Sequence, residues 1–196
     1  MSKTRLEAFS DGVFAIAVTL LILDVIESAR PHEASELGRE LLRAWPSYAG
    51  YAVSFVTIGI MWVNHHALFH LFDHVDRLLL FTNLLLLLCV AFVPFPTALV
   101  AEFLRGDGAR AATLTYGLTM TVTALVFNAL WHSGRRLLRA DADPREVSGF
   151  TRSYLIGPLM YGGATLLAFA SAYASAAAYA AIAGFFVLSA SVWSRG

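Results

Sequence analysis

The stretch Arg5–Val25, RLEAFSDGVFAIAVTLLILDV, is a long apolar run with polar residues near its start, among them Arg5, Ser10 and Asp11. An apolar run of about 20 residues is long enough to cross a bilayer as a helix. Charged groups beside such a helix are costly unless they pair with other groups or line a water-filled cavity. We therefore expect a permanent first membrane helix whose polar residues either hold it to its neighbours or take part in transport.

The composition of the chain is typical of a membrane protein. Of its 196 residues, 58% are hydrophobic, which exceeds the share in soluble domains. The 14 basic and 14 acidic residues balance, which argues against a nucleic-acid partner. The one cysteine, Cys89, excludes an intramolecular disulfide. No GxSxG, HExxH, Walker or Rossmann motif occurs, so we expect neither an enzyme nor a cofactor or metal site.

The apolar runs predict an all-α, polytopic membrane protein that forms one domain over residues 1–196. Six runs are near the length that a spanning helix needs. They are Phe9–Ile26, Trp45–Val63, Leu78–Val100, Ala111–Leu130, Tyr154–Tyr173 and Ser175–Trp193. The last two are separated only by a short Ser171–Ser175 link, so a count of five spans is an alternative.

The distribution of basic residues predicts the orientation of the spans. With the amino terminus inside, nine of the 14 basic residues lie on the cytoplasmic side and five outside. Cytoplasmic loops carry an excess of lysine and arginine. We therefore expect a cell-membrane protein with both termini in the cytoplasm.

One face of the first helix is lined by small, branched and hydroxyl side chains. Its members follow each other by four, three and four positions: Gly12, Ile16, Thr19 and Leu23. At 100° per residue they lie within about 40° of one line down the helix, whereas Ser10 and Asp11 point elsewhere. This face is a candidate pore surface. The alternative is a helix–helix packing face, since glycine and threonine also allow close approach.

The run Arg5-Leu-Glu-Ala-Phe9-Ser10-Asp11 resembles the RxxxFSD signature of the transmembrane protein 175 family. These are potassium channels known from lysosomes, with shorter prokaryotic relatives. Later features are also similar: Trp62 with His65 and His66, Asn83, and Pro94-Phe-Pro96-Thr97. The resemblance covers the first half of the chain well, and from about Gly106 only the hydropathy matches.

This resemblance implies a homotetramer around a central pore that the first helix lines. It implies apolar rings as the constriction, here Ile16 and Leu23, with Thr19 as a hydroxyl ring between them. No TVGYG-like run occurs in the sequence, so we expect no selectivity filter built from backbone carbonyls. An apolar ring penalises the loss of water, and potassium loses its water more easily than sodium. We therefore expect a potassium-permeable cation channel with a weak preference for potassium over sodium.

Acidic residues follow the first helix. Glu27 lies one turn beyond Leu23 and would form a ring at the outer mouth if the helix continues. The polar stretch Asp24–Arg43 could concentrate cations there, with a short amphipathic helix opened by Pro31. A surface loop without a role in conduction is the alternative.

The polar residues of the first helix need partners at similar depth on other spans. By resemblance, Arg5, Ser10 and Asp11 hold this helix against the second and third spans. The expected partners are Trp62, His66 and Asn83. We expect a structural role for this group in preference to direct ion binding.

Three histidines, His66, His70 and His74, recur at intervals of four residues. Such a stripe could bind a metal or sense protons, although a polar stripe at the membrane edge is the simpler interpretation. Two other functions stay open at this point. The protein could be a small secondary transporter or proton-coupled carrier that uses Asp11 and the histidines, or a structural membrane subunit without flux.

Overall fold

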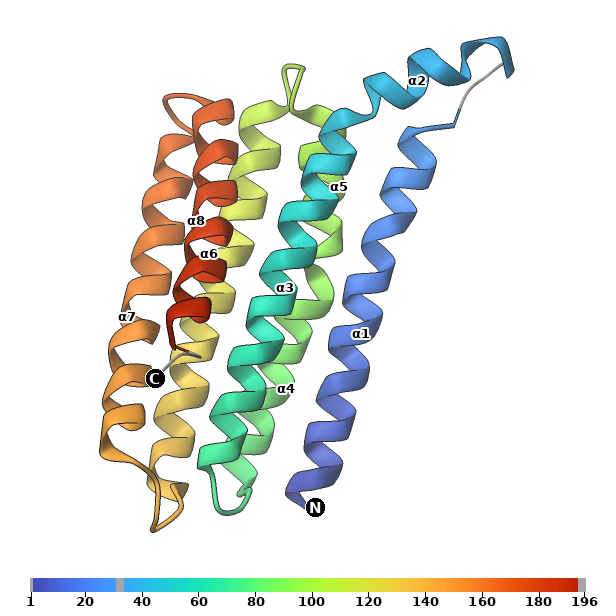
Figure 1. Ribbon diagram of the computed structural model, residues 1–196. Helices are drawn as coiled ribbons and strands as arrows, with labels where there is room; N and C mark the ends of the chain where they lie inside the picture. Colours follow the sequence, from blue (N-terminus) through green and yellow to red (C-terminus); the bar gives the residue numbers. More distant parts are fainter. Residues whose placement is uncertain (1, 31–33, 194–196) are drawn as a thin grey trace.

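The computed structural model describes residues 2–30 and 34–193, and these form helices joined by short links (Figure 1). The α-helices are α1 (Lys3–Ser28), α2 (Leu37–Arg43), α3 (Trp45–Leu71), α4 (Arg77–Phe92), α5 (Pro94–Phe103), α6 (Ala109–Gly134), α7 (Pro144–Leu167) and α8 (Ala172–Trp193). Two short 3₁₀ turns, η1 (Ala34–Glu36) and η2 (Arg135–Leu137), precede α2 and follow α6. The predicted all-α class is confirmed.

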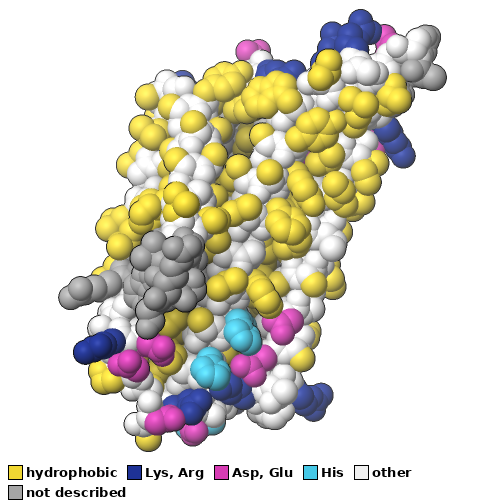
Figure 2. Space-filling view, in the orientation of Figure 1, with side chains coloured by type: hydrophobic (Ala, Val, Ile, Leu, Met, Phe, Trp, Pro, Cys, Tyr) yellow, Lys and Arg dark blue, Asp and Glu magenta, His cyan; other side chains and the backbone are white. Residues whose placement is uncertain are grey.

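The long helices stand side by side as a bundle, with α1 at one edge and α7 and α8 at the opposite edge (Figure 1). Helix α1 packs against α3, α4 and α5, and α6 packs against α4, α5, α7 and α8. Hydrophobic side chains cover most of the visible face, while charged side chains gather toward its two ends and histidines toward the lower end alone (Figure 2). This distribution suits a protein that crosses a bilayer.

Four segments are long and apolar enough to cross a membrane: Lys3–Ser28, Trp45–Leu71, Arg77–Phe103 and Ala109–Leu137. The chain is therefore a multi-pass membrane protein. Helices α7 and α8 stand where the fifth and sixth spans were predicted. The described apolar part of α8 is shorter, Ala172–Leu188. The count of six spans remains a prediction.

The boundary between the last two predicted spans needs correction. Helix α7 ends at Leu167, and Tyr173, predicted as the end of the fifth span, lies in α8. The chain turns at residues 168–171, where Ser171 Oγ accepts a hydrogen bond from the Ala174 amide. This serine caps α8, which is the common role of a serine at a helix start.

Two prolines shape the bundle. Pro94 lacks an amide proton, so the third span is divided at Val93 into α4 and α5. Pro158 lies inside α7 and cannot bond to the Tyr154 carbonyl, one turn earlier. The Asn128 side chain of α6 donates to that carbonyl instead. A membrane interior offers no water to replace a lost hydrogen bond, so such a substitute is required.

At the amino-terminal end of the bundle, backbone bonds join the α3–α4 link to the η2–α7 link. The Asp73 amide donates to the Leu137 carbonyl at 2.8 Å, and the Arg139 amide donates to the Leu71 carbonyl at 2.9 Å. Asp76 caps α4 by accepting from the Leu79 amide and also pairs with Arg136. The Leu79 amide, and then the Arg136 guanidinium, hold the pKa of the Asp76 carboxyl below its usual value.

The polar stretch after α1 leads to the short helix α2, which projects from the opposite end of the bundle (Figure 1). We call this the far end. Pro31, which was predicted to open a helix, lies outside the described residues. Helix α2 buries none of its side chains, and Leu42 is 80% exposed.

Gly117 of α6 makes room for side chains of α7 and α8. A Cβ atom there would lie 2.0 Å from the Tyr179 hydroxyl oxygen and 2.2 Å from Thr165 Oγ1. We expect Gly117→Ala to lower the free energy of unfolding by about 1–3 kcal/mol, because α7 and α8 must move away from α6. Thermal unfolding in detergent, followed by tryptophan fluorescence, measures this.

Gly163→Ala in α7 is the matched control, because nothing lies within 4 Å of its Cβ position. Alanine there should leave the unfolding temperature unchanged or raise it, since alanine favours helix. Equal unfolding temperatures for the two variants would contradict the close packing at Gly117.

Candidate functional site

Helix α1 has a buried face and an exposed face. The buried residues are Leu6, Ser10, Phe14, Ala17 and Leu21, spaced by three or four positions. They pack toward α3, α4 and α5. No helix among the described residues covers the opposite face: Ile16 is 60% exposed and Leu23 58%. The rotation of α1 about its axis therefore decides which side chains remain available for function.

Three buried polar side chains fix that rotation: Ser10 of α1, His65 of α3 and Asn83 of α4. The Ser10 hydroxyl donates to the Leu6 carbonyl at 2.9 Å, so its oxygen is free to accept. Asn83 Nδ2 donates to that oxygen at 3.0 Å. Asn83 Oδ1 then faces His65 Nε2 at 2.8 Å, and His65 must donate. Every bond in this chain has a defined direction, which ties three helices together.

The assignment of His66 to this group is corrected by the structure. His65 is 1% exposed and stacks on Phe69 with ring centroids 4.4 Å apart, while His66 is exposed beside Trp62. One signal in the sequence could have identified His65. It continues the apolar stripe of α3, spaced by three and four positions, that includes Met61 and Leu68.

Asp11 and Trp62 form a direct hydrogen bond between α1 and α3. Trp62 Nε1 donates to Asp11 Oδ1 at 2.8 Å, and both side chains are exposed on the surface of the protomer. Arg5 is also exposed, and among the described residues it forms none of the hydrogen bonds that link this polar group. The structure therefore brings together five side chains, Ser10, Asp11, Trp62, His65 and Asn83, in two separate contacts.

The candidate pore surface lies on the exposed face of α1. Gly12, Ile16, Thr19 and Leu23 are all exposed. The Thr19 hydroxyl donates to the Ala15 carbonyl at 3.0 Å and to the Ile16 carbonyl at 2.9 Å. Because its proton is used within the helix, its oxygen presents lone pairs to the exposed side. The face thus alternates apolar side chains with one acceptor oxygen, a pattern that can meet a cation but not hold it firmly.

Glu27 lies in the last turn of α1 and is exposed. Its Oε2 is 3.3 Å from Arg30 Nη1. An exposed ion pair of this kind contributes little to stability, so Glu27 is available to other cations. Its place one turn beyond Leu23 agrees with the predicted line along the helix.

The predicted histidine stripe is interrupted. Helix α3 ends at Leu71, so His74 lies in the following link, where its Nδ1 is 3.1 Å from Asp73 Oδ2. His66 and His70 remain on one exposed side of α3. Within the described residues, no group of three or more His, Cys, Asp or Glu side chains is arranged to hold a metal ion.

Comparisons with known proteins agree with this geometry. A sequence model of the family described as "Endosomal/lysosomal potassium channel TMEM175" matches residues 5–94. The chain is 44% identical over 188 residues to a potassium channel of Chamaesiphon minutus, covering 94% of this chain and 93% of that one. It is 49% identical over 173 residues to a potassium channel of Streptomyces collinus, covering 86% and 83%.

A solved structure is also similar. The crystal structure of a lysosomal potassium-selective channel TMEM175 homolog from Chamaesiphon minutus superposes with a TM-score of 0.86 at 42% identity. The match covers 95% of this chain and 96% of that chain. It therefore includes the second half, in which the sequence resembled the family only in hydropathy.

Asn83 is the centre of the buried polar chain, so its removal leaves two partners unsatisfied. We expect Asn83→Ala to lower the free energy of unfolding by about 1–2 kcal/mol and to loosen α1. Thr82→Ala is the matched control, because Thr82 is half-buried and its hydroxyl donates to the Leu78 carbonyl of its own helix, not to another helix, among the described residues. Thermal unfolding of both variants in detergent checks this, and equal unfolding temperatures would contradict the role of Asn83.

Proposed function

Since the chain belongs to the TMEM175 family of potassium channels, we propose that it forms a homotetrameric, potassium-permeable channel with α1 lining the pore. The family is one of channels and not of enzymes. The observation that carries the proposal is that α1 has one exposed face, while its opposite face packs against the bundle and is hydrogen bonded to it. Cyclic symmetry would turn each exposed side chain into a ring around the axis.

In this proposal the rings of Ile16 and Leu23 form the constriction. Apolar rings offer no ligand to replace the water that an ion loses, so passage depends on the cost of dehydration. That cost is smaller for potassium than for sodium, so the selectivity is weak. A narrow apolar ring can also lose its water and close the path, which gives it a second role as a gate.

Thr19 would add a ring of acceptor oxygens between the two apolar rings. Its oxygen lone pairs face the exposed side because the hydroxyl proton is bonded to the Ala15 and Ile16 carbonyls. At the far end, Glu27 would add an acidic ring that raises the local cation concentration. This arrangement is consistent with six spans, a place in the cell membrane and cytoplasmic termini, which we propose with it.

The carrier alternative requires Asp11 and the histidines to exchange protons during transport. Asp11 Oδ1 already accepts from Trp62, and His65 donates to Asn83 within the buried chain. These groups have a structural use that accounts for them. We therefore propose the channel, and a flux that depends on a coupled gradient would overturn this choice.

The filter can be tested by the reversal potential of the purified protein in a planar bilayer with potassium on one side and sodium on the other. We expect a reversal potential shifted toward potassium in the unsubstituted protein. Ile16→Asn or Leu23→Asn should move the reversal potential toward zero, because a ring of amide side chains can replace ion-bound water. The permeability ratio of potassium to sodium should then be about one.

Ile22→Asn is the control, because Ile22 is exposed on α1 but points about 120° away from Ile16. It should leave the reversal potential unchanged. Potassium-selective current that is indifferent to both test substitutions would place the filter elsewhere, and no current from intact oligomers would overturn the channel.

Asp11 allows a separate test of its role in assembly. The exposed bond to Trp62 fixes α1 against α3, so we expect Asp11→Asn to weaken it and reduce the yield of tetramer. Size-exclusion chromatography with light scattering measures the yield, and Glu7→Gln on the same helix is the control. Intact Asp11→Asn tetramers with changed ion selectivity would instead indicate direct ion binding by Asp11.

A further inference from the structure

A small polar pocket lies at the far end of the bundle, apart from the exposed face of α1. Its volume is about 190 Å³. Its walls come from the last residue of α1, the α2–α3 junction and the end of α5. Because three of the four candidate spans, Lys3–Ser28, Trp45–Leu71 and Arg77–Phe103, begin or end there, the pocket lies at the level where a bilayer places its headgroups.

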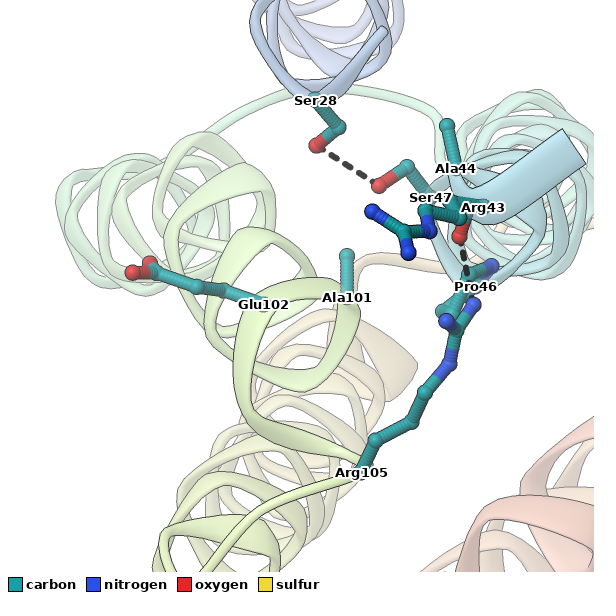
Figure 3. Close-up of a pocket in the computed structure, with 8 residues that line it drawn as sticks. All are labelled: Ser28, Arg43, Ala44, Pro46, Ser47, Ala101, Glu102 and Arg105. Atoms are coloured by element: carbon teal, nitrogen blue, oxygen red, sulfur yellow. Dashed lines mark hydrogen bonds between the residues drawn. The ribbon is translucent and has the colours of Figure 1, made fainter. Parts of the chain in front are cut away.

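Two guanidinium groups converge on this pocket, those of Arg43 and Arg105 (Figure 3). Arg105 crosses from the end of α5 and donates to the Arg43 carbonyl. The Arg43 side chain lies over Ala101, on the other side of that carbonyl (Figure 3). Two like charges therefore line one pocket, and an anion bound there would be attracted by both.

Acidic side chains only partly offset these two charges. Arg43 Nη1 is 3.1 Å from Glu40 Oε1, and this arginine is still 61% exposed. Glu102 is the one acidic residue among the described residues of the pocket wall, and its carboxylate points away from both guanidinium groups (Figure 3). The sides of the two guanidinium groups that line the pocket are therefore available to a ligand.

Apolar side chains beside the pocket indicate a lipid as the source of that ligand. Trp45 is 49% exposed, and the Arg105 guanidinium lies 5.2 Å from its ring centroid. Leu42, the neighbour of Arg43, is 80% exposed. Tryptophan is enriched at the headgroup level of membranes, and arginine binds phosphate with paired hydrogen bonds.

We propose that Arg43 and Arg105 bind the phosphate group of a phospholipid in the leaflet at the far end, with Trp45 and Leu42 against its glycerol and acyl parts. The site is separate from the pore surface and does not depend on ion conduction. It would fasten the α2–α3 junction to the membrane, next to the end of α1. The lipid would thereby hold the connection that leads out of the first helix.

Native mass spectrometry of the purified protein, titrated with phosphatidylglycerol in detergent, measures the affinity per protomer. We expect the Arg43→Gln/Arg105→Gln variant to bind the lipid about tenfold more weakly, through loss of charge-assisted bonds to phosphate. The matched control is Arg30→Gln/Arg110→Gln, which removes two exposed arginines from the same end. It should change the affinity by less than about twofold. An equal loss of lipid affinity in both variants would show that general surface charge causes the effect, and would overturn the proposed site.

A second variant tests the proposal without touching either arginine. Glu40→Gln/Glu102→Gln removes the nearby carboxylates, so we expect it to tighten phosphatidylglycerol binding about threefold. Weaker binding would mean that the acids hold a cation there and would overturn the proposal. Glycerol 1-phosphate distinguishes the source of the phosphate: displacement of the lipid at equal concentrations would indicate a site for free phosphate, whereas the lipid site requires no displacement.

Discussion

The hydrogen bonds from His65 to Asn83 and from Asn83 to Ser10 are the constraint on which the rest of the structure depends. In a membrane, an apolar helix can rotate about its axis at little cost, because lipid and protein side chains are equally apolar. A buried chain of polar groups removes that freedom, since each group must keep its partner. It is the fixed rotation of α1 that leaves Ile16 on the exposed side.

The buried face of α1 determines which side chains are left on its exposed face. The buried side satisfies its polar groups inside the protomer, and its apolar residues pack on α3, α4 and α5. The exposed side offers branched side chains and one hydroxyl whose proton is already bonded. Such a face suits a ring of identical copies, in which ions meet side chains rather than backbone carbonyls. The polar group and the candidate pore surface are thus two results of one helix rotation.

The second half of the bundle supports the first by close packing and by repaired backbone bonds. Gly117 admits the Tyr179 hydroxyl and Thr165 next to α6, and Asn128 serves the carbonyl that Pro158 cannot. At the amino-terminal end, the backbone bonds between Asp73 and Leu137 and between Arg139 and Leu71 join the two halves. These contacts stabilise the helices against which α1 packs, and they leave its exposed face uncovered.

The sequence by itself determined the all-α class, the apolar runs that became α1, α3, α4–α5 and α6, and the line of residues from Gly12 to Leu23. These depend on local spacing, which is a property of one helix. Tertiary structure decided that His65 bonds to Asn83, because the two residues lie on different helices and only the packing of α3 beside α4 brings them together. It also moved the turn before α8 to residues 168–171. The convergence of Arg43 and Arg105, 62 positions apart, likewise arises only when α5 returns to the start of α3.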